Sequence, residues 1–145
     1  MLVDLLLGIT RNRGAMNLYL MAAGVLAFIV GLVHSVLGEI LIFRGLRSRG
    51  IVPTDGGQLL RERHVRIIWA SWHVLTVLGW CVATILWWLA QDSSLSQSHE
   101  FVARAIAAAM LVSAAFVFVG TKGKHPGWAG LLGVAVLVFL GERAR

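Results

Sequence analysis

Four ionisable side chains lie in or beside long apolar segments, where they could do chemistry. They are His34, Glu39, His73 and His125. A charged group at the centre of a membrane helix costs about 2.5–3.5 kcal/mol on insertion scales, so such residues usually serve a function. Neutral imidazole is the commonest metal ligand in proteins, and histidines with a carboxylate suit zinc, iron or copper. The sequence therefore predicts a transition-metal site at these four residues.

The segments that must position these residues are apolar enough to lie in a membrane. Hydrophobic residues make up 58% of the chain and charged residues 14%, with a mean hydropathy of +0.80. The candidate spans cover about residues 17–43, 65–90, 101–120 and 126–141. All should be helices, because backbone groups in lipid must be satisfied within their own segment. We therefore predict an all-α fold, an integral membrane four-helix transmembrane bundle that forms a single domain over residues 1–145.

A short apolar segment precedes the first candidate span. Residues 2–9 are apolar but too short to span, so we expect an interfacial segment. A cleaved signal peptide is disfavoured, because Arg11 and Arg13 follow the apolar run instead of preceding it.

Cys81 is the single cysteine, which excludes an intrachain disulfide and any multi-cysteine metal site.

The charge pattern predicts an orientation. The net charge is +6, but the basic residues lie between apolar runs, which favours anchoring at lipid headgroups over nucleic-acid binding. The loop of residues 44–64, its flank and the turn at 121–127 carry eight Lys/Arg, against five on the opposite face. This places the 44–64 loop in the cytoplasm and both termini in the periplasm of a bacterial inner membrane. Tryptophans near the ends of the spans predict aromatic belts: Trp69, Trp72, Trp87, Trp88 and Trp128.

The depth of the two central histidines is informative. His34 lies nine residues before the end of the first segment, and His73 lies eight residues after the start of the second. Adjacent spans run antiparallel, so both rings should lie about 12–14 Å in from the basic face. Glu39 and His125 should lie nearer the same face. Equal depth also suits a variant of the metal site, a b-type haem held by His34 and His73.

Helical spacing predicts how the first segment packs. Gly24, Gly31 and Gly38 recur every seven residues and so share one face, which His34 also shares. Small residues allow helices to approach closely in lipid, so this face should point into the bundle or form the seam of a homo-oligomer. Such close packing leaves little room for a macrocycle.

Further polar residues should support the site. A polar and aromatic stripe follows the second segment at helical spacing and comprises Arg66, Trp69, His73, Thr76 and Trp80. Ser35 and Glu39 form a second pair, one position round the helix from His34. Glu39 and Arg66 should lie at one level and are expected to form an ion pair.

Three of these strings carry a resemblance. HSVLGE (34–39), WHVLT (72–76) and HPGW (125–128) resemble motifs of a group of small bacterial four-span membrane proteins of uncharacterised function. The motifs are short but spread over most of the chain. The resemblance implies a topology and no chemistry.

Three other functions stay open. A dimer could carry out proton-coupled or anion transport through the histidines and Glu39. The protein could instead be a structural subunit of a membrane complex without a ligand, its histidines bonding Ser35 and Thr76 across helices. In an intramembrane enzyme, Ser35 would be the nucleophile and His73 its base, because His34 points about 100° away from Ser35 on the same helix.

Overall fold

The chain folds into helices, as expected. A computed structural model describes residues 16–91 and 97–144, and over these residues it contains four long helices and no strand. The elements are α2 (Leu18–Leu41), the short 3₁₀ helix η1 (Phe43–Leu46), α3 (Glu62–Gln91), α4 (Gln97–Thr121) and α5 (Gly127–Arg143). The all-α prediction is confirmed for this part of the chain. The expected interfacial segment at residues 2–9 lies outside it.

Three of the four helices are long and apolar enough to cross a membrane. These are α2, α3 and α4. The fourth helix, α5, has 17 residues, and at 1.5 Å per residue it is about 26 Å long, short of the roughly 30 Å hydrocarbon core. Three candidate membrane spans are thus found by length and composition, whereas the fourth span stays a prediction.

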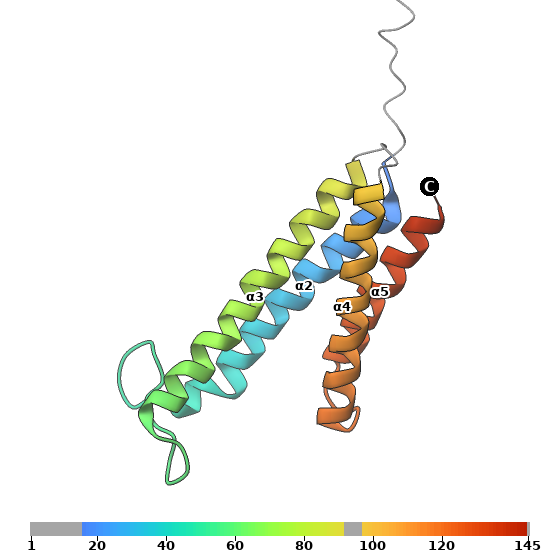
Figure 1. Ribbon diagram of the computed structural model, residues 1–145. Coiled ribbons are helices and arrows are strands. Elements are labelled where there is room, and N and C mark those ends of the chain that lie inside the picture. Colours follow the sequence, from blue (N-terminus) through green and yellow to red (C-terminus); the bar gives the residue numbers. More distant parts are fainter. Residues whose placement is uncertain (1–15, 92–96, 145) are drawn as a thin grey trace, which may run out of the picture.

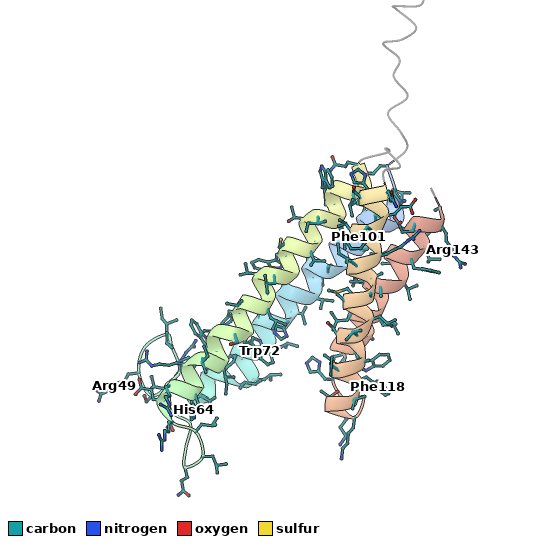
Figure 2. The ribbon with its side chains drawn as sticks, in the orientation of Figure 1. Arg49, His64, Trp72, Phe101, Phe118 and Arg143 are labelled. Atoms are coloured by element: carbon teal, nitrogen blue, oxygen red, sulfur yellow. The ribbon has the colours of Figure 1, made fainter. Side chains whose placement is uncertain are left out.

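The helices pair into two hairpins that diverge. Figure 1 shows α2 beside α3 and α4 beside α5, and α2 also packs on α5, whereas α3 and α4 touch little. The hairpins meet where α2 begins and α5 ends, which we call the closed end. They separate towards the connection of residues 42–61 and the turn of residues 122–126, which we call the open end. Figure 2 shows Arg49 and His64 at the open end and Phe101 and Arg143 at the closed end.

The closed end holds the apolar core. Asn17 caps α2, with its Oδ1 accepting a hydrogen bond from the Leu20 N–H at 3.1 Å. Its Nδ2 donates to the Gly141 carbonyl at 2.7 Å, and its backbone N–H donates to the Ala90 carbonyl at 2.9 Å. One residue therefore ties α2 to α3 and α5. The core beside it includes Leu20, Ala23, Leu86, Leu89, Ala90, Ala103, Val134 and Val138.

The glycine face of α2 is the seam with α3. A Cβ at Gly24 would come within 3.0 Å of a backbone oxygen of α3, and one at Gly31 within 3.1 Å of the Trp80 Nε1. At Gly38 an added Cβ would overlap the Trp72 indole. The predicted packing face is therefore confirmed, and its partner is α3 of the same chain. Trp72, expected in an aromatic belt, lies in this seam instead.

Candidate functional site

The polar residues predicted for one site fall into two groups around α2. His34 lines a cavity between the two hairpins, whereas Ser35, Glu39 and His73 form a separate cluster that is absent from the lining of that cavity. The division follows from helix geometry, because successive residues point about 100° apart. His34 and Ser35 therefore face different surroundings although they are neighbours in sequence.

The cavity has a volume of about 450 Å³ and is bordered by all four long helices. Aliphatic side chains make up most of its lining. The polar residues that reach it are His34 from α2, Thr76 from α3, Ser113 from α4 and His125 from the turn before α5. A largely apolar space with a few polar groups is the usual form of a small-molecule site.

Two buried polar atoms belong to residues that line this cavity. His34 Nε2 and Thr76 Oγ1 have no hydrogen-bond partner among residues 16–91 and 97–144. Thr76 is only 3% exposed. Leaving a buried polar group unsatisfied costs about 1–3 kcal/mol, so two of them beside one cavity need an explanation.

The Trp72 indole holds His34 in place. The two rings stack with centroids 4.1 Å apart and planes at 9°. The Trp72 Nε1 also donates to the His34 carbonyl at 3.0 Å. In Figure 2, Trp72 lies on the half of α3 nearer the open end. Contacts from α3 therefore fix both the ring and the backbone of His34.

His125 borders the cavity at the open end. Its side chain is exposed, and its Nδ1 accepts a hydrogen bond from the Gly127 N–H at 3.0 Å. Pro126 is the N-cap of α5, so the helix begins one residue after the predicted start at Pro126. His34 and His125 are thus the two histidines in the lining of the cavity.

The second group is a chain of polar contacts between α2, α3 and the connection of residues 42–61. The Ser35 Oγ lies 2.6 Å from His73 Nδ1. On the other side of the ring, His73 Nε2 lies 3.8 Å from Glu39 Oε2. Arg47 then pairs with Glu39 Oε1 at 2.5 Å. We call Ser35, His73, Glu39 and Arg47 the serine–histidine cluster.

The expected ion pair between Glu39 and Arg66 is wrong. Glu39 pairs with Arg47, and Arg66 pairs with Glu62 one turn earlier on α3 at 2.6 Å. Arg66 and Glu62 are exposed and lie four residues apart on the same helix, a spacing at which an ion pair forms without a contribution from any other helix. Arg47 follows η1, which turns the chain back over Glu39. Sequence spacing gave no sign of that turn.

Aromatic rings flank the serine–histidine cluster. Trp69 meets the His73 ring edge-on, with centroids 5.0 Å apart and planes at 71°. Phe43 lies 6.1 Å from the same ring. The Trp69 indole N–H is buried and has no hydrogen-bond partner within the described part of the chain. The predicted stripe on α3 is therefore divided, with Trp69 and His73 at this cluster and Thr76 at the cavity.

The predicted four-ligand metal group is not assembled over the described residues. In residues 16–91 and 97–144, no three His, Cys, Asp or Glu side chains are placed to hold one ion together. His34 and His125 share the cavity lining, while Glu39 and His73 belong to the serine–histidine cluster. Metal or haem binding at these residues stays a prediction.

Comparison with protein families, curated proteins and solved structures finds no match for the chain. The resemblance of the HSVLGE, WHVLT and HPGW motifs to small four-span membrane proteins is therefore not tested by these comparisons. Functional conclusions must come from the two sites themselves.

Proposed function

We propose that this membrane protein binds a lipid-soluble molecule with a carbonyl or hydroxyl head group, such as an isoprenoid quinone, in the cavity between the hairpins. The observation that carries the proposal is the pair of buried polar atoms without partners, His34 Nε2 and Thr76 Oγ1, on residues lining one apolar cavity.

The chemistry of the lining selects this class of ligand. A volume of about 450 Å³ lies within the usual range for small-molecule sites, and its aliphatic walls suit an apolar body. The Thr76 hydroxyl can donate and accept, and the His34 Nε2 does either according to its tautomer. A carbonyl or hydroxyl head would satisfy both atoms and offset the cost of burying them.

The open end offers an entry route. The hairpins diverge there (Figure 1), and α3 and α4 have few contacts with each other. A lipid-soluble molecule could enter sideways from the bilayer between those two helices. His125, exposed beside the mouth, is a third polar group that the head could meet.

A haem or a transition-metal ion bound in the same cavity is the second candidate. The observation that favours it is the presence of His34 and His125 in one lining. In this version His125 replaces His73 as the expected partner of His34, because the His73 ring is engaged by Ser35. An optical spectrum and metal analysis of the purified protein separate this candidate from the first.

The proposed setting is a bacterial inner membrane with four spans, the 44–64 loop in the cytoplasm and both termini in the periplasm. The basic residues of the open end support this orientation by the positive-inside rule. In a homo-oligomer, which we also propose, every copy would have the same orientation. Reporter fusions after residues 50 and 145 should report opposite sides of the membrane. Fusions that report the same side would contradict the four-span arrangement.

A space-filling substitution tests the ligand proposal. Gly79 lines the cavity, and a Cβ added there meets no atom within 4 Å, so Gly79→Leu should fill the cavity without disturbing the helices. Gly120 also has open space around it but does not line the cavity, so Gly120→Leu is the matched control.

The assay titrates a short-chain ubiquinone analogue into the purified protein in nanodiscs and follows quenching of tryptophan fluorescence. We expect saturable binding by the wild type and by Gly120→Leu, and at least a tenfold weaker affinity for Gly79→Leu. Binding that does not saturate, or that Gly79→Leu leaves unchanged, would overturn the proposal. A Soret band in the wild type that Gly79→Leu abolishes would favour haem instead.

A further inference from the structure

The serine–histidine cluster has the contacts of a nucleophilic site. A serine hydroxyl becomes a nucleophile when an adjacent base takes its proton and a third group orients that base. Ser35 Oγ lies 2.6 Å from His73 Nδ1, within hydrogen-bond distance, and Glu39 Oε2 lies 3.8 Å from the other ring nitrogen. Glu39 is fixed in turn by Arg47 at 2.5 Å.

The order of these contacts fits a base that is aimed at the serine. When Ser35 donates to Nδ1, the neutral His73 ring carries its hydrogen on Nε2, which faces the Glu39 carboxylate. The carboxylate would then stabilise the imidazolium that forms on proton transfer. Serine, histidine and an acid recur in this relation on unrelated folds, and the group is recognised by geometry and not by sequence order.

The cluster can be reached from outside the bundle. The His73 and Glu39 side chains are each 30% exposed, and none of the cluster residues lines the cavity. Ser35 lies six residues before the end of α2, which places it roughly 9 Å along the axis from the open end of that helix. The 24 residues of α2 make a helix about 36 Å long, so Ser35 would lie roughly 6 Å inside a 30 Å hydrocarbon core centred on that helix.

We propose that Ser35 and His73 are catalytic residues of an acyl-ester hydrolase whose substrate is an anionic glycerolipid of the surrounding bilayer, with Glu39 as a positioning residue. The site is independent of the cavity ligand. The ester carbonyls of a glycerolipid lie in the interfacial layer, about one helical turn from Ser35 on the side of the open end. Arg44 and Arg49 are exposed on the connection above and would attract an anionic headgroup.

The reaction balances with water as the second reactant. Ser35 Oγ bonds to the ester carbonyl carbon while its proton passes to His73 Nδ1. The bond from that carbon to the glycerol oxygen then breaks, and His73 gives the proton to the departing oxygen. Water attacks the acyl-serine in the same way, its proton passing through His73 to Ser35 Oγ. The products are a lysolipid and a fatty acid, and no electrons are exchanged.

Trp69 supplies a hydrogen-bond donor beside this site. Its ring is 5.0 Å from that of His73, and its buried indole N–H has no partner among the residues that the structure describes. A preorganised donor near the reacting carbonyl stabilises the negative charge that develops on its oxygen. Trp69→Phe, which removes the N–H together with the five-membered ring but keeps an aromatic side chain, should therefore slow the reaction.

Labelling with a fluorophosphonate tests the nucleophile. In this reaction Ser35 Oγ bonds to phosphorus, fluoride leaves and His73 takes the proton. The intact protein is labelled in nanodiscs, and mass spectrometry locates the modified serine. Ser71 on α3 and Ser113 on α4 serve as internal controls, since neither lies in the cluster. We expect labelling of Ser35 at least tenfold above both controls.

Variants separate the roles of the cluster residues. His73→Gln should slow labelling about a hundredfold, as expected for loss of a general base. Glu39→Gln should slow it less, and Glu39→Asp should recover part of the rate, which a merely structural carboxylate would not do. Helicity and melting temperature are measured for each variant.

The substrate class is tested in nanodiscs of phosphatidylglycerol and of phosphatidylcholine. Fatty-acid release from phosphatidylglycerol that exceeds release from phosphatidylcholine, and that Ser35→Ala abolishes, is the expected result. Failure of the folded wild-type protein to label at Ser35 would overturn the nucleophile, whatever the variants do. Labelling at Ser35 without fatty-acid release from either lipid would overturn the lipid substrate.

Discussion

The two ends of the bundle differ in packing and in polarity. At the closed end, Leu20, Leu86 and Val138 are fully buried in one apolar core, and Asn17 joins three helices. At the open end the hairpins separate, and His34, His73, His125 and Glu39 lie around a cavity and a surface cluster. The apolar core that joins the two hairpins therefore lies apart from these polar residues, although the seam between α2 and α3 continues to Gly38 and Trp72 near the open end.

This separation has a physical reason. Between membrane helices no hydrophobic driving force acts, so association depends on close packing and interhelical hydrogen bonds. The closed end supplies both, which allows the open end to keep a cavity and polar atoms without hydrogen-bond partners within the described residues. Functional regions are commonly drawn from the less stable parts of a fold and supported by more stable ones.

The largest expected effect is at a core leucine. Leu86→Ala at the closed end should lower the free energy of unfolding by about 2 kcal/mol, through lost contacts and the cavity left behind. This lies at the low end for buried leucines, because lipid solvates the separated helices as well as the core does. Thermal or denaturant unfolding in detergent measures it.

Leu78→Ala is the matched control on the same helix. Leu78 is 60% exposed and borders the cavity, so lipid can fill the space it leaves, and the free energy of unfolding should change by less than about 0.5 kcal/mol. Equal losses for the two leucines would mean that the two ends are packed alike.

The next effect concerns the polar tie at the closed end. Asn17→Ala removes both the N-cap of α2 and the bond to the Gly141 carbonyl, and should lower the free energy of unfolding by about 1–2 kcal/mol. Asn17→Ser keeps a capping oxygen but is too short to reach Gly141. A serine variant as unstable as the alanine variant would show that the interhelical bond, and not the cap, matters.

Trp72 offers a smaller test nearer the open end. Trp72→Phe keeps an aromatic ring against Gly38 but loses the 3.0 Å bond to the His34 carbonyl, and should lower the free energy of unfolding by about 1 kcal/mol. Trp80→Phe loses a longer bond of 3.3 Å to the Phe28 carbonyl and should cost less. The melting temperatures of the two variants decide the order, and a reversed order would contradict the role given to Trp72.

Helical periodicity was sufficient to predict which face of α2 packs, but it left open whether the partner was a helix of the same chain or a second copy. The glycines at positions 24, 31 and 38 repeat at whole turns, and a repeat of small residues leaves one way for a neighbouring helix to approach. The helical class of the fold followed from apolar length alone. These features depend on local spacing, which the sequence states directly.

The arrangement of the site could not be predicted in the same way. Equal depth placed His34 and His73 at one level but left open on which side of the seam each ring lies. The indole of Trp72 lies against His34, and His73 turns to Ser35. Glu39 pairs with Arg47 because η1 turns the chain back towards α2. The path of such a connection leaves no periodic pattern in the sequence. The rotation of each helix about its own axis and the path of each loop depend on tertiary contacts, which residue spacing along the chain does not specify.

The smallest expected effect has the opposite sign and bears directly on the comparison of the two ends. Thr76→Val replaces a buried hydroxyl that has no partner within residues 16–91 and 97–144 by a methyl group of similar shape. The free energy of unfolding should rise by about 0.5–1 kcal/mol without ligand, because the cost of the unsatisfied oxygen disappears. The same variant should bind the quinone analogue less tightly.

Thr84→Val provides the control for this sign. Thr84 is exposed and its hydroxyl donates to the Trp80 carbonyl at 2.9 Å, so its removal should leave stability unchanged or slightly lower. A rise in the free energy of unfolding for Thr76→Val but not for Thr84→Val would show that the Thr76 hydroxyl destabilises the fold. Residues that bind a ligand often have such a cost in stability. A loss of stability at Thr76 would instead mean that the open end is stabilised by its polar atoms, as the closed end is by Asn17.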